Sequence, residues 1–323
     1  MPSNEPHRRP GPSSPTPRIS VIIPNLNQEI YLEQAICSVL DQGYENLELL
    51  VMDGGSIDQS QAIIDTYAED LDYWQSAWDS GPAEAVNTAL TWATGQITLV
   101  LDADDTLLPH ALHEAAAAFA AGAEWVVGRA VRVDEIDEVL GELPARAAGD
   151  LAGFLADETG PLRSSAVFYR TDLLKAMGGF DSAFKLAYAH EMHARLYAAE
   201  RTPTPLSVQV ATVRDHDHSL TATHGLLCGT EYLDAAERYA RHLAPTPRFA
   251  LWRSCDESRR IFAAAELQIQ REAHTRGLWQ QLLKRPWWLA RADYRQKLLL
   301  KAVPAETAQP AKVEKPTEHR RAA

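Results

Sequence analysis

The chain has 323 residues, of which 46% are hydrophobic and 23% charged, so a sizeable core is expected and global disorder is not. Its net charge of −13 argues against general nucleic-acid binding. No apolar run approaches the roughly 20 residues that span a bilayer, and the N-terminus lacks the apolar core of a signal peptide. The three cysteines form neither a zinc nor a disulfide pattern, which fits a reducing cytoplasm.

Residues 1–17 contain six prolines among polar residues, which predicts a disordered leader. After it, short β-rich runs alternate with amphipathic stretches. Strands are expected at 19–23, 47–52, 73–78 and 97–101, with helices at 29–41, from Ser56 or Asp58 to 67, and at 82–94. This alternation predicts a parallel sheet with right-handed crossovers.

An acidic residue follows three of these strands: Asp53, Asp79 and Asp102. The last strand runs straight into the sequence DADD, residues 102–105, and Pro109 suits the first turn of the next helix. The acids therefore lie at the carboxyl ends of strands, where open α/β sheets bind ligands. Each acid alone could simply cap a helix. Their repetition favours a shared site, and close carboxylates repel each other unless a cation joins them.

The remaining pattern divides the chain further. Residues 134–163 are acidic and irregular, with a short helix expected near 150–156. The other expected elements up to residue 214 are helices at 110–121, 171–177 and 189–200 and strands at 125–133, 165–170 and 205–214. Helices are expected again at 231–242 and 251–276, and a second disordered segment at 302–323. We therefore expect a leader (1–17), a main domain (18–224), a helical C-terminal region (225–301) and a disordered tail (302–323).

Several motifs, in this order, resemble those of the family 2 glycosyltransferases with the GT-A fold. They are ISVIIPNLN (19–27), LEQAICSVLDQ (32–42), VMDGGSID (51–58), DSG with EAVN (79–87), DADD (102–105), and later FYR (168–170) and GGFD (178–181). The resemblance covers about residues 18–220. It implies an α/β fold with a Rossmann-like, mostly parallel sheet flanked by helices, followed by a helical C-terminal extension.

The resemblance also implies a reaction, the inverting transfer of a sugar from a nucleotide diphosphate to an acceptor hydroxyl. The donor would be a UDP-sugar, and the acceptor a glycan, lipid-linked glycan or other glycoconjugate. Donor-binding roles are implied for Pro24, Asn27, Asp53, Asp79, Asp102 and Asp104.

A metal site is implied as well. Asp104 or Asp105 would bind Mg²⁺ or Mn²⁺, which stabilises the leaving diphosphate. His216 lies in RDHDHSLT (214–221), which resembles a late segment of the family, and would contact the diphosphate or complete the metal shell. The alternative is that His216 is a polar loop histidine.

Inversion also requires a general base for the acceptor hydroxyl. The family usually places an Asp at the start of a late helix, but in the aligned stretch AHEMHARL (189–196) that position holds Ala189. Glu191 is the expected base and His190 the second candidate. Alternatively, Glu191 only pairs with Arg195 one helical turn later, or the protein binds a nucleotide sugar without catalysis.

Two further hypotheses remain open. Residues 278–301 combine Trp and Leu with Lys and Arg, which suits a helix on an anionic membrane surface and a peripheral position on the inner membrane. The same segment could instead pack on the main domain. Asp102-x-Asp104-x-Thr106 also fits haloacid-dehalogenase-like phosphohydrolases, with Asp102 as nucleophile and Asp104 as acid/base. That motif normally opens its domain, whereas here it follows two βα units.

Overall fold

The computed structural model describes residues 16–157, 162–252, 255–256 and 258. Most of the predicted leader, nearly all of the 251–276 helix, the basic segment 278–301 and the tail lie outside the described residues. None of the helices in the described part of the chain is long and apolar enough to cross a membrane.

The N-terminal half of the sheet is parallel, as predicted, with the strand order β3-β2-β1-β4. These strands are β1 (Ile19–Asn25), β2 (Leu47–Asp53), β3 (Tyr73–Ser76) and β4 (Ile97–Val100), and the helices between them are α1 (Leu32–Leu40), α2 (Ser60–Tyr67) and α3 (Pro82–Trp92). Side chains alternate across the sheet, so Val21 and Ile23 join one hydrophobic cluster and Ile22 joins the other. Both faces of β1 are therefore buried, as its continuous apolar run predicts.

The second half of the sheet is mixed, with one parallel pair of strands among antiparallel pairs, so it departs in part from the prediction of a mostly parallel sheet. The order continues through β8 (Val167–Arg170), β6 (Trp125–Val133), β9 (Thr204–Arg214) and β5 (Thr106–Leu107), while β7 (Val139–Leu143) pairs with β6. β8 is antiparallel to both β4 and β6. The short helix η1 (Ser164–Ala166) contacts the acids that follow β4, so the chain enters β8 from their edge of the sheet and runs the opposite way.

The chain turns sharply after the acidic motif, which corrects the expected helix start. Thr106 and Leu107 form β5, and the hydroxyls of Thr106 and Thr212 lie 2.6 Å apart across its pairing with β9. α4 spans Ala111–Ala120, and its N-cap His110 has a left-handed φ of 68°. Pro109 therefore precedes the helix instead of forming its first turn. β7 was also not expected, whereas α5 (Leu151–Leu155) lies where a short helix was predicted.

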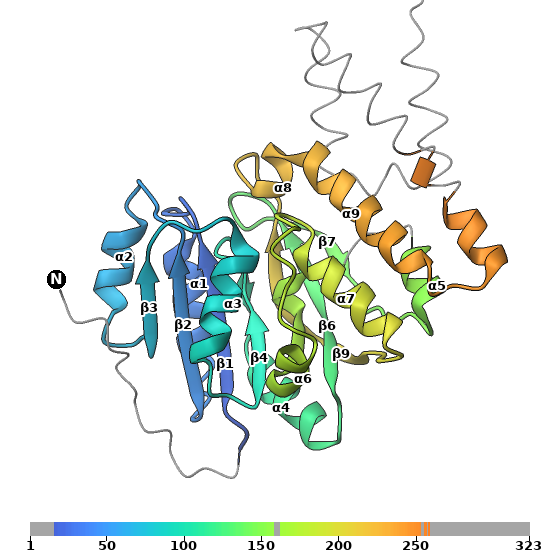
Figure 1. Cartoon of the computed structure of the whole chain (residues 1–323). Helices are drawn as coiled ribbons and strands as arrows, with labels where there is room; N and C mark the ends of the chain where they lie inside the picture. Colours follow the sequence, from blue (N-terminus) through green and yellow to red (C-terminus); the bar gives the residue numbers. More distant parts are fainter. Residues whose placement is uncertain (1–15, 158–161, 253–254, 257, 259–323) are drawn as a thin grey trace, which may run out of the picture.

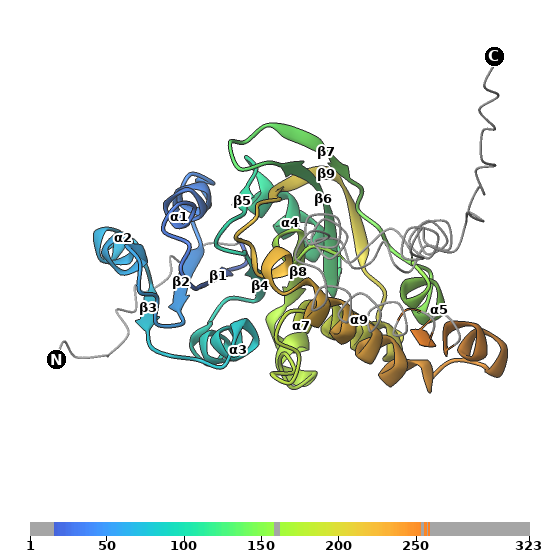
Figure 2. The ribbon, with the colours of Figure 1, turned by 90° about the horizontal axis from the view of Figure 1, so that it is seen from above.

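Helices cover both faces of the sheet. Seen from above in Figure 2, α1, α2 and α4 lie on one side, and α3 and α7 (Tyr188–Ala198) on the other. α6 (Thr171–Ala176) lies below the middle of the sheet in Figure 1. The carboxyl ends of β1, β2 and β4 point to the top of that view, where α8 (Leu220–Thr223) also lies.

α9 (Gly225–Ala240) runs alongside α7 (Figures 1 and 2). It begins six residues earlier than the helix expected at 231. Its Ala235 and Tyr239 are buried in the same hydrophobic cluster as Met192 and Leu196 of α7. The boundary expected at residue 224 therefore does not separate α9 from the core of the main domain.

Candidate active site

A cavity of about 350 Å³ opens at the carboxyl edge of the sheet. Its lining includes five of the residues singled out from the sequence: Pro24, Asp102, Asp104, Asp105 and His216. Residues from the loop after β1 and from α7 and α9 also line it, including Gln28, Tyr188, Ala189, His190 and Tyr232. The topology thus brings segments more than 200 positions apart in the sequence around one group of acids.

Asp102 lies directly after β4 and is held by two serines of η1. Its backbone N–H donates to the Ser165 hydroxyl at 3.1 Å, and its Oδ2 accepts from the Ser164 hydroxyl at 2.6 Å. Burial, and then the charge of Asp104, raise the pKa of Asp102 to about 6. A cation beside the two carboxylates would relieve this repulsion.

Asp104 faces His216 across the cavity, with Oδ2 lying 2.9 Å from Nε2. The His216 ring is 5% exposed and packs edge-on against Tyr31, with ring centroids 4.8 Å apart. Its other nitrogen, Nδ1, has no hydrogen-bond partner among the described residues. His216 is therefore part of the acidic site and not a surface loop histidine.

Arg214 holds the backbone around this pair. Its Nε donates to the Asp104 carbonyl at 3.1 Å, and Nη1 donates to the Asp134 carbonyl at 2.9 Å. Its guanidinium also pairs with Asp137 at 2.6 Å and lies 4.6 Å above the Tyr31 ring centroid. One buried side chain thus ties the acidic motif to the β6–β7 connection and to the segment before α1.

Asp105 does not fit the predicted role of metal ligand. Its carboxylate is 3% exposed and accepts from the Ser165 hydroxyl at 2.6 Å and from the Arg214 backbone N–H at 2.9 Å. Burial raises its pKa well above the usual range. Because both carboxylate oxygens already accept hydrogen bonds from η1 and β9, Asp105 links these two elements to the acidic motif.

The carboxylate of Asp53 is likewise fully bonded, at the carboxyl ends of the first three strands. It is 2% exposed and accepts from Asn25 Nδ2 at 2.7 Å, from the Ser76 hydroxyl at 2.6 Å, and from the backbone N–H and hydroxyl of Ser56. It therefore connects the ends of β1, β2 and β3. Asn27, with φ 53°, accepts from the Ile57 N–H at 2.9 Å and joins the same loops, although neither Asp53 nor Asn27 lines the cavity itself.

Asp79 lies beside this network. Its Oδ1 accepts from the Gly81 N–H at 2.8 Å, and burial raises its pKa. A Cβ on Gly54 would come within 3.0 Å of Asp79 Oδ2, so only glycine leaves this close approach open. Asp53 and Asp79 are therefore neighbours, as the strand pattern predicted, but they lie outside the residues that line the cavity.

Glu191 lies elsewhere, contrary to its predicted role as the base. It is 1% exposed and binds Arg195 Nη2 at 2.5 Å and the Tyr239 hydroxyl, in a separate depression that does not include the acids. The i,i+4 pairing with Arg195 is thus observed. One position earlier, helical geometry turns the side chain to another face, and His190 lines the cavity between Phe154 and Tyr232, with ring centroids 4.9 and 4.7 Å away.

Among the described residues, no group of three or more His, Cys, Asp or Glu side chains could by itself hold a metal ion. This does not conflict with a Mg²⁺ or Mn²⁺ site, because such ions commonly use one or two carboxylates together with substrate phosphates and water. Asp102 and Asp104 fit this donor set, with His216 next to them. Sequence reasoning missed Ser164 and Ser165, which position these acids; nothing in the local sequence distinguishes them from other loop serines.

Comparison with known proteins identifies relatives for this arrangement. Residues 20–146 match the model of the family "Glycosyl transferase family 2". The chain is 34% identical over 100 residues to the GalNAc(5)-diNAcBac-PP-undecaprenol beta-1,3-glucosyltransferase of Campylobacter jejuni, covering 30% of this chain and 32% of the relative. It is 35% identical over 95 residues to the UDP-Glc:alpha-D-GlcNAc-diphosphoundecaprenol beta-1,3-glucosyltransferase WfgD of Escherichia coli, covering 29% and 38%. The matched segment thus spans about a third of these relatives.

Solved structures extend the likeness to most of the chain. S. aureus TarS 1-349 in complex with UDP-GlcNAc is similar with a TM-score of 0.55 at 17% identity, covering 87% of this chain and 92% of TarS 1-349. The mannosyltransferase PcManGT from Pyrobaculum calidifontis, in complex with GDP-Man and Mn²⁺, gives a TM-score of 0.55 at 20% identity and covers 94% and 91%. At these identities the likeness shows the fold, which is the expected GT-A type.

Proposed function

From the match of residues 20–146 to the model of the family "Glycosyl transferase family 2", we propose that the protein transfers a sugar from a UDP-sugar to an acceptor hydroxyl with inversion. The acceptor class that we propose is a lipid-linked glycan or a polysaccharide. The observation that carries the proposal is that Asp102, Asp104 and His216 line one cavity, between the loop after β1 and the start of α7. A nucleotide diphosphate has the length and charge to reach from those loops to the acids.

The relatives support the two substrate classes. The E. coli relative is named for UDP-Glc as its donor, and both glucosyltransferases are named for undecaprenol-linked acceptors. TarS was solved with UDP-GlcNAc. PcManGT was solved with GDP-Man, so a guanine nucleotide is the competing donor and belongs in every binding test.

On the donor side, we assign the base and ribose to the loops after β1, β2 and β3. Pro24, Asn27 and Asp79 offer the surface, and Asp53 keeps the three strand ends together. A base N–H could bind Asp53 by replacing one of its serine donors, since Ser56 and Ser76 hydroxyls can rotate away. The diphosphate would then lie beside Asp102 and Asp104.

For the divalent cation we assign Asp104 as the ligand, with Asp102 and His216 beside it, and leave out Asp105. When bound, Mg²⁺ or Mn²⁺ supplies positive charge that stabilises the leaving diphosphate. The protein's own contribution is positional. Ser164 donates to the Asp102 carboxylate, while Ser165 and Arg214 bond to the backbone of Asp102 and Asp104, so that the motif does not have to reorganise during the reaction.

For the acceptor proton we assign His190 in place of Glu191. Its ring lines the cavity, and burial lowers its pKa to about 4, so the imidazole is neutral at pH 7 and can accept a proton. An ordinary aspartate, with a pKa near 3.9, is a base of comparable strength. Ala189 also lines the cavity, at the position where the family usually places an Asp. The second candidate function is therefore binding of a nucleotide sugar without transfer.

The deciding experiment titrates the full chain with UDP, GDP and UDP-glucose by calorimetry, with and without Mn²⁺. It then follows transfer from UDP-glucose to a synthetic GlcNAc-diphosphate-alkyl acceptor. We expect Mn²⁺-dependent UDP binding, transfer, and an inverted anomeric signal by NMR. UDP binding without transfer or donor hydrolysis would favour the binding-only function, and absence of nucleotide binding would overturn the proposal. Peripheral membrane contact through residues 278–301 remains a prediction.

A further inference from the structure

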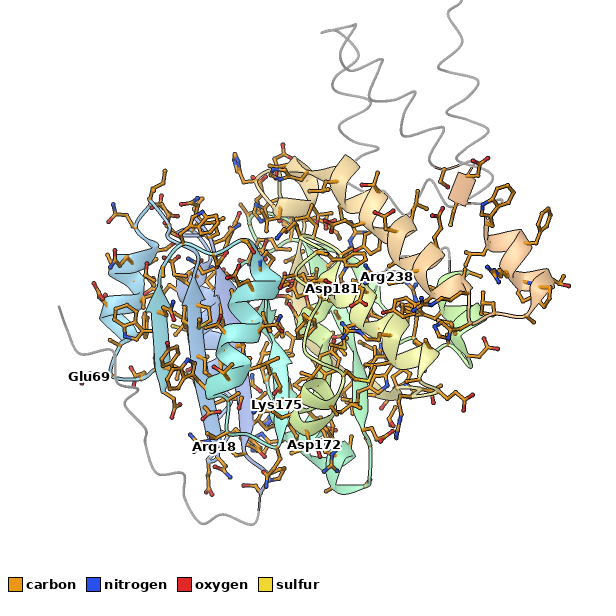
Figure 3. All side chains as sticks on the ribbon, viewed as in Figure 1. Arg18, Glu69, Asp172, Lys175, Asp181 and Arg238 are labelled. Atoms are coloured by element: carbon orange, nitrogen blue, oxygen red, sulfur yellow. The ribbon has the colours of Figure 1, made fainter. Side chains whose placement is uncertain are left out.

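α9 carries a row of polar contacts on the face that meets the main domain. Glu231 and Arg238 are seven residues apart, which is two helical turns, and Tyr239 follows directly. Arg238 pairs with Asp181 at 2.5 Å, as Figure 3 shows at the junction of α9 with the segment before α7. Tyr239 donates to Glu191 of α7. These two contacts dock the C-terminal part of α9, whereas Glu231 serves a different segment.

The Glu231 carboxylate binds the backbone at the beginning of α7. Its Oε1 accepts from the Lys185 N–H, and its Oε2 from the Leu186 and Ala187 N–H groups, each at 2.8 Å. Ala187 is the N-cap of α7 and has no side chain that can accept a hydrogen bond. A carboxylate from another helix therefore satisfies the backbone donors of the segment that leads into α7, up to and including its N-cap. Glu231 is 5% exposed, so water does not compete freely for these bonds.

The segment that Glu231 holds is a wall of the cavity. Leu186, Tyr188 and Ala189 line the cavity from this segment, and Tyr232 lines it from α9, next to Glu231. The Tyr232 ring packs edge-on against His190 with centroids 4.7 Å apart. The Glu231 carboxylate therefore fixes the start of α7 relative to Tyr232 of α9, the two parts that form this wall.

This wall lies on the far side of the acids from the nucleotide loops. The strand order across the sheet is β3-β2-β1-β4-β8. The nucleotide loops follow the first three of these strands and Asp102 follows β4, so the acids lie between the nucleotide loops and β8. If the diphosphate lies at Asp102 and Asp104, the transferred sugar and its acceptor must lie toward α7 and α9. The chemistry of this side is aromatic and aliphatic, which suits the faces of acceptor sugar rings.

We propose that Glu231 is the positioning residue of the acceptor subsite, and that α9 through Tyr232 forms part of that subsite. This inference rests on the proposed transferase function. It assigns the first part of the C-terminal region a direct role in acceptor binding. Glu231 touches no substrate and acts through the backbone of 185–187.

The test compares Glu231→Gln and Glu231→Ala with two controls on the same helix. Gln keeps the size but cannot accept all three N–H donors without turning its own NH₂ group toward one of them. Arg238→Gln weakens the docking of α9 without touching 185–187. Asp234→Asn removes a charge from the exposed face of α9. UDP affinity with Mn²⁺, KM and kcat for the GlcNAc-diphosphate-alkyl acceptor, and hydrogen exchange of the amides at 185–187 are measured for each.

For Glu231→Gln we expect the acceptor KM to rise about five-fold or more while UDP affinity stays within about two-fold of wild type. Amides 185–187 should exchange faster, and Glu231→Ala should show a larger effect of the same kind. Both controls should stay within about two-fold on every kinetic measure. A split between acceptor KM and donor affinity is not expected from general destabilisation.

Three results would overturn the inference alone: a wild-type acceptor KM in Glu231→Gln, equal losses of donor and acceptor binding, or the same KM defect in Arg238→Gln. A wild-type chain that neither binds UDP nor transfers sugar would instead overturn the proposed function and this inference with it. The two failures are thus distinguishable in the unmodified protein.

Discussion

Asp104 Oδ2 lies 2.9 Å from His216 Nε2, although the two residues are 112 positions apart in the chain. The pair exists because β4 and β9 end at the same edge of the sheet. Asp104 lies in the turn between β4 and β5, and β5 pairs with β9, which ends two residues before His216. Because the Asp104 carboxylate and the His216 imidazole are this close and both face the cavity, substituting Asp104 is the most direct test of the metal assignment.

Asp104→Asn should lower Mn²⁺-dependent UDP affinity by about ten-fold or more, because the amide keeps the shape but lacks the charge that binds a hard cation. His216→Gln should cost less, since Asp104 remains. Glu69→Gln, on the exposed surface far from the cavity (Figure 3), serves as the control. Calorimetric titration with and without Mn²⁺ measures the effect. Unchanged Mn²⁺-dependence in Asp104→Asn would refute the assignment.

Arg214→Lys should loosen the acidic motif without removing a carboxylate. Lysine keeps the charge but cannot donate simultaneously to Asp104, Asp134 and Asp137, as the guanidinium does. We expect a loss of about 1–3 kcal/mol in the free energy of unfolding and weaker Mn²⁺–UDP binding. Chemical denaturation and the same titrations measure both. Wild-type values for both would show that the guanidinium geometry is dispensable.

His190→Gln and Glu191→Gln separate the two candidate bases. His190→Gln should leave UDP affinity within about two-fold but lower kcat for transfer by about 100-fold, the usual range for loss of general-base catalysis. Glu191→Gln should retain transfer and cost about 1–3 kcal/mol of stability, because Arg195 and Tyr239 lose a buried charged partner. Steady-state kinetics and denaturation distinguish them. The reverse pattern would return the catalytic role to Glu191.

The contribution of His190 and His193 to the free energy of unfolding should fall as the pH falls from about 6.5 toward 4, whereas the raised pKa values of Asp102 and Asp105 act in the opposite direction. Burial lowers the pKa of His193 to about 3 and of His190 to about 4, against 6.5 for an exposed histidine. In this pH range the two histidines bind protons in the unfolded chain but stay neutral in the folded chain, so acid favours unfolding through these two groups. At pH 5 each histidine should cost roughly 2 kcal/mol relative to pH 8.

Melting temperatures measured across this pH range check the expectation. His193→Gln removes one titrating group and can keep a hydrogen bond to the Tyr169 hydroxyl, which lies 2.6 Å from His193 Nε2. This variant should therefore show a shallower decrease below pH 6.5 than wild type. An equal slope in the two proteins would mean that His193 is not the group responsible.

The sequence by itself determined the N-terminal half of the fold and the location of the acids. Continuous apolar runs such as 19–23 and 47–52 can bury both faces only as central strands. A parallel sheet then places Asp53, Asp79 and Asp102 at its carboxyl edge. These patterns of apolar residues are local, because side-chain direction repeats every two residues in a strand and every 3.6 in a helix. They can therefore be identified in the sequence before the fold is known. The family motifs lie in this same segment, which is also the segment that the family model matches.

Only the tertiary structure decided which side chains are available to a ligand. Asp104 and Asp105 are adjacent in sequence and both line the cavity, yet the Asp104 carboxylate contacts His216 whereas both oxygens of Asp105 bond to Ser165 and Arg214, which come from η1 and β9. Glu191 and His190 are likewise adjacent but point to different sides of α7. The antiparallel direction of β8 and the bond from Glu231 to 185–187 also arise from contacts between segments 44 or more positions apart. Hydrogen-bond saturation and helix-face orientation depend on such distant partners, so local sequence patterns could not have predicted them.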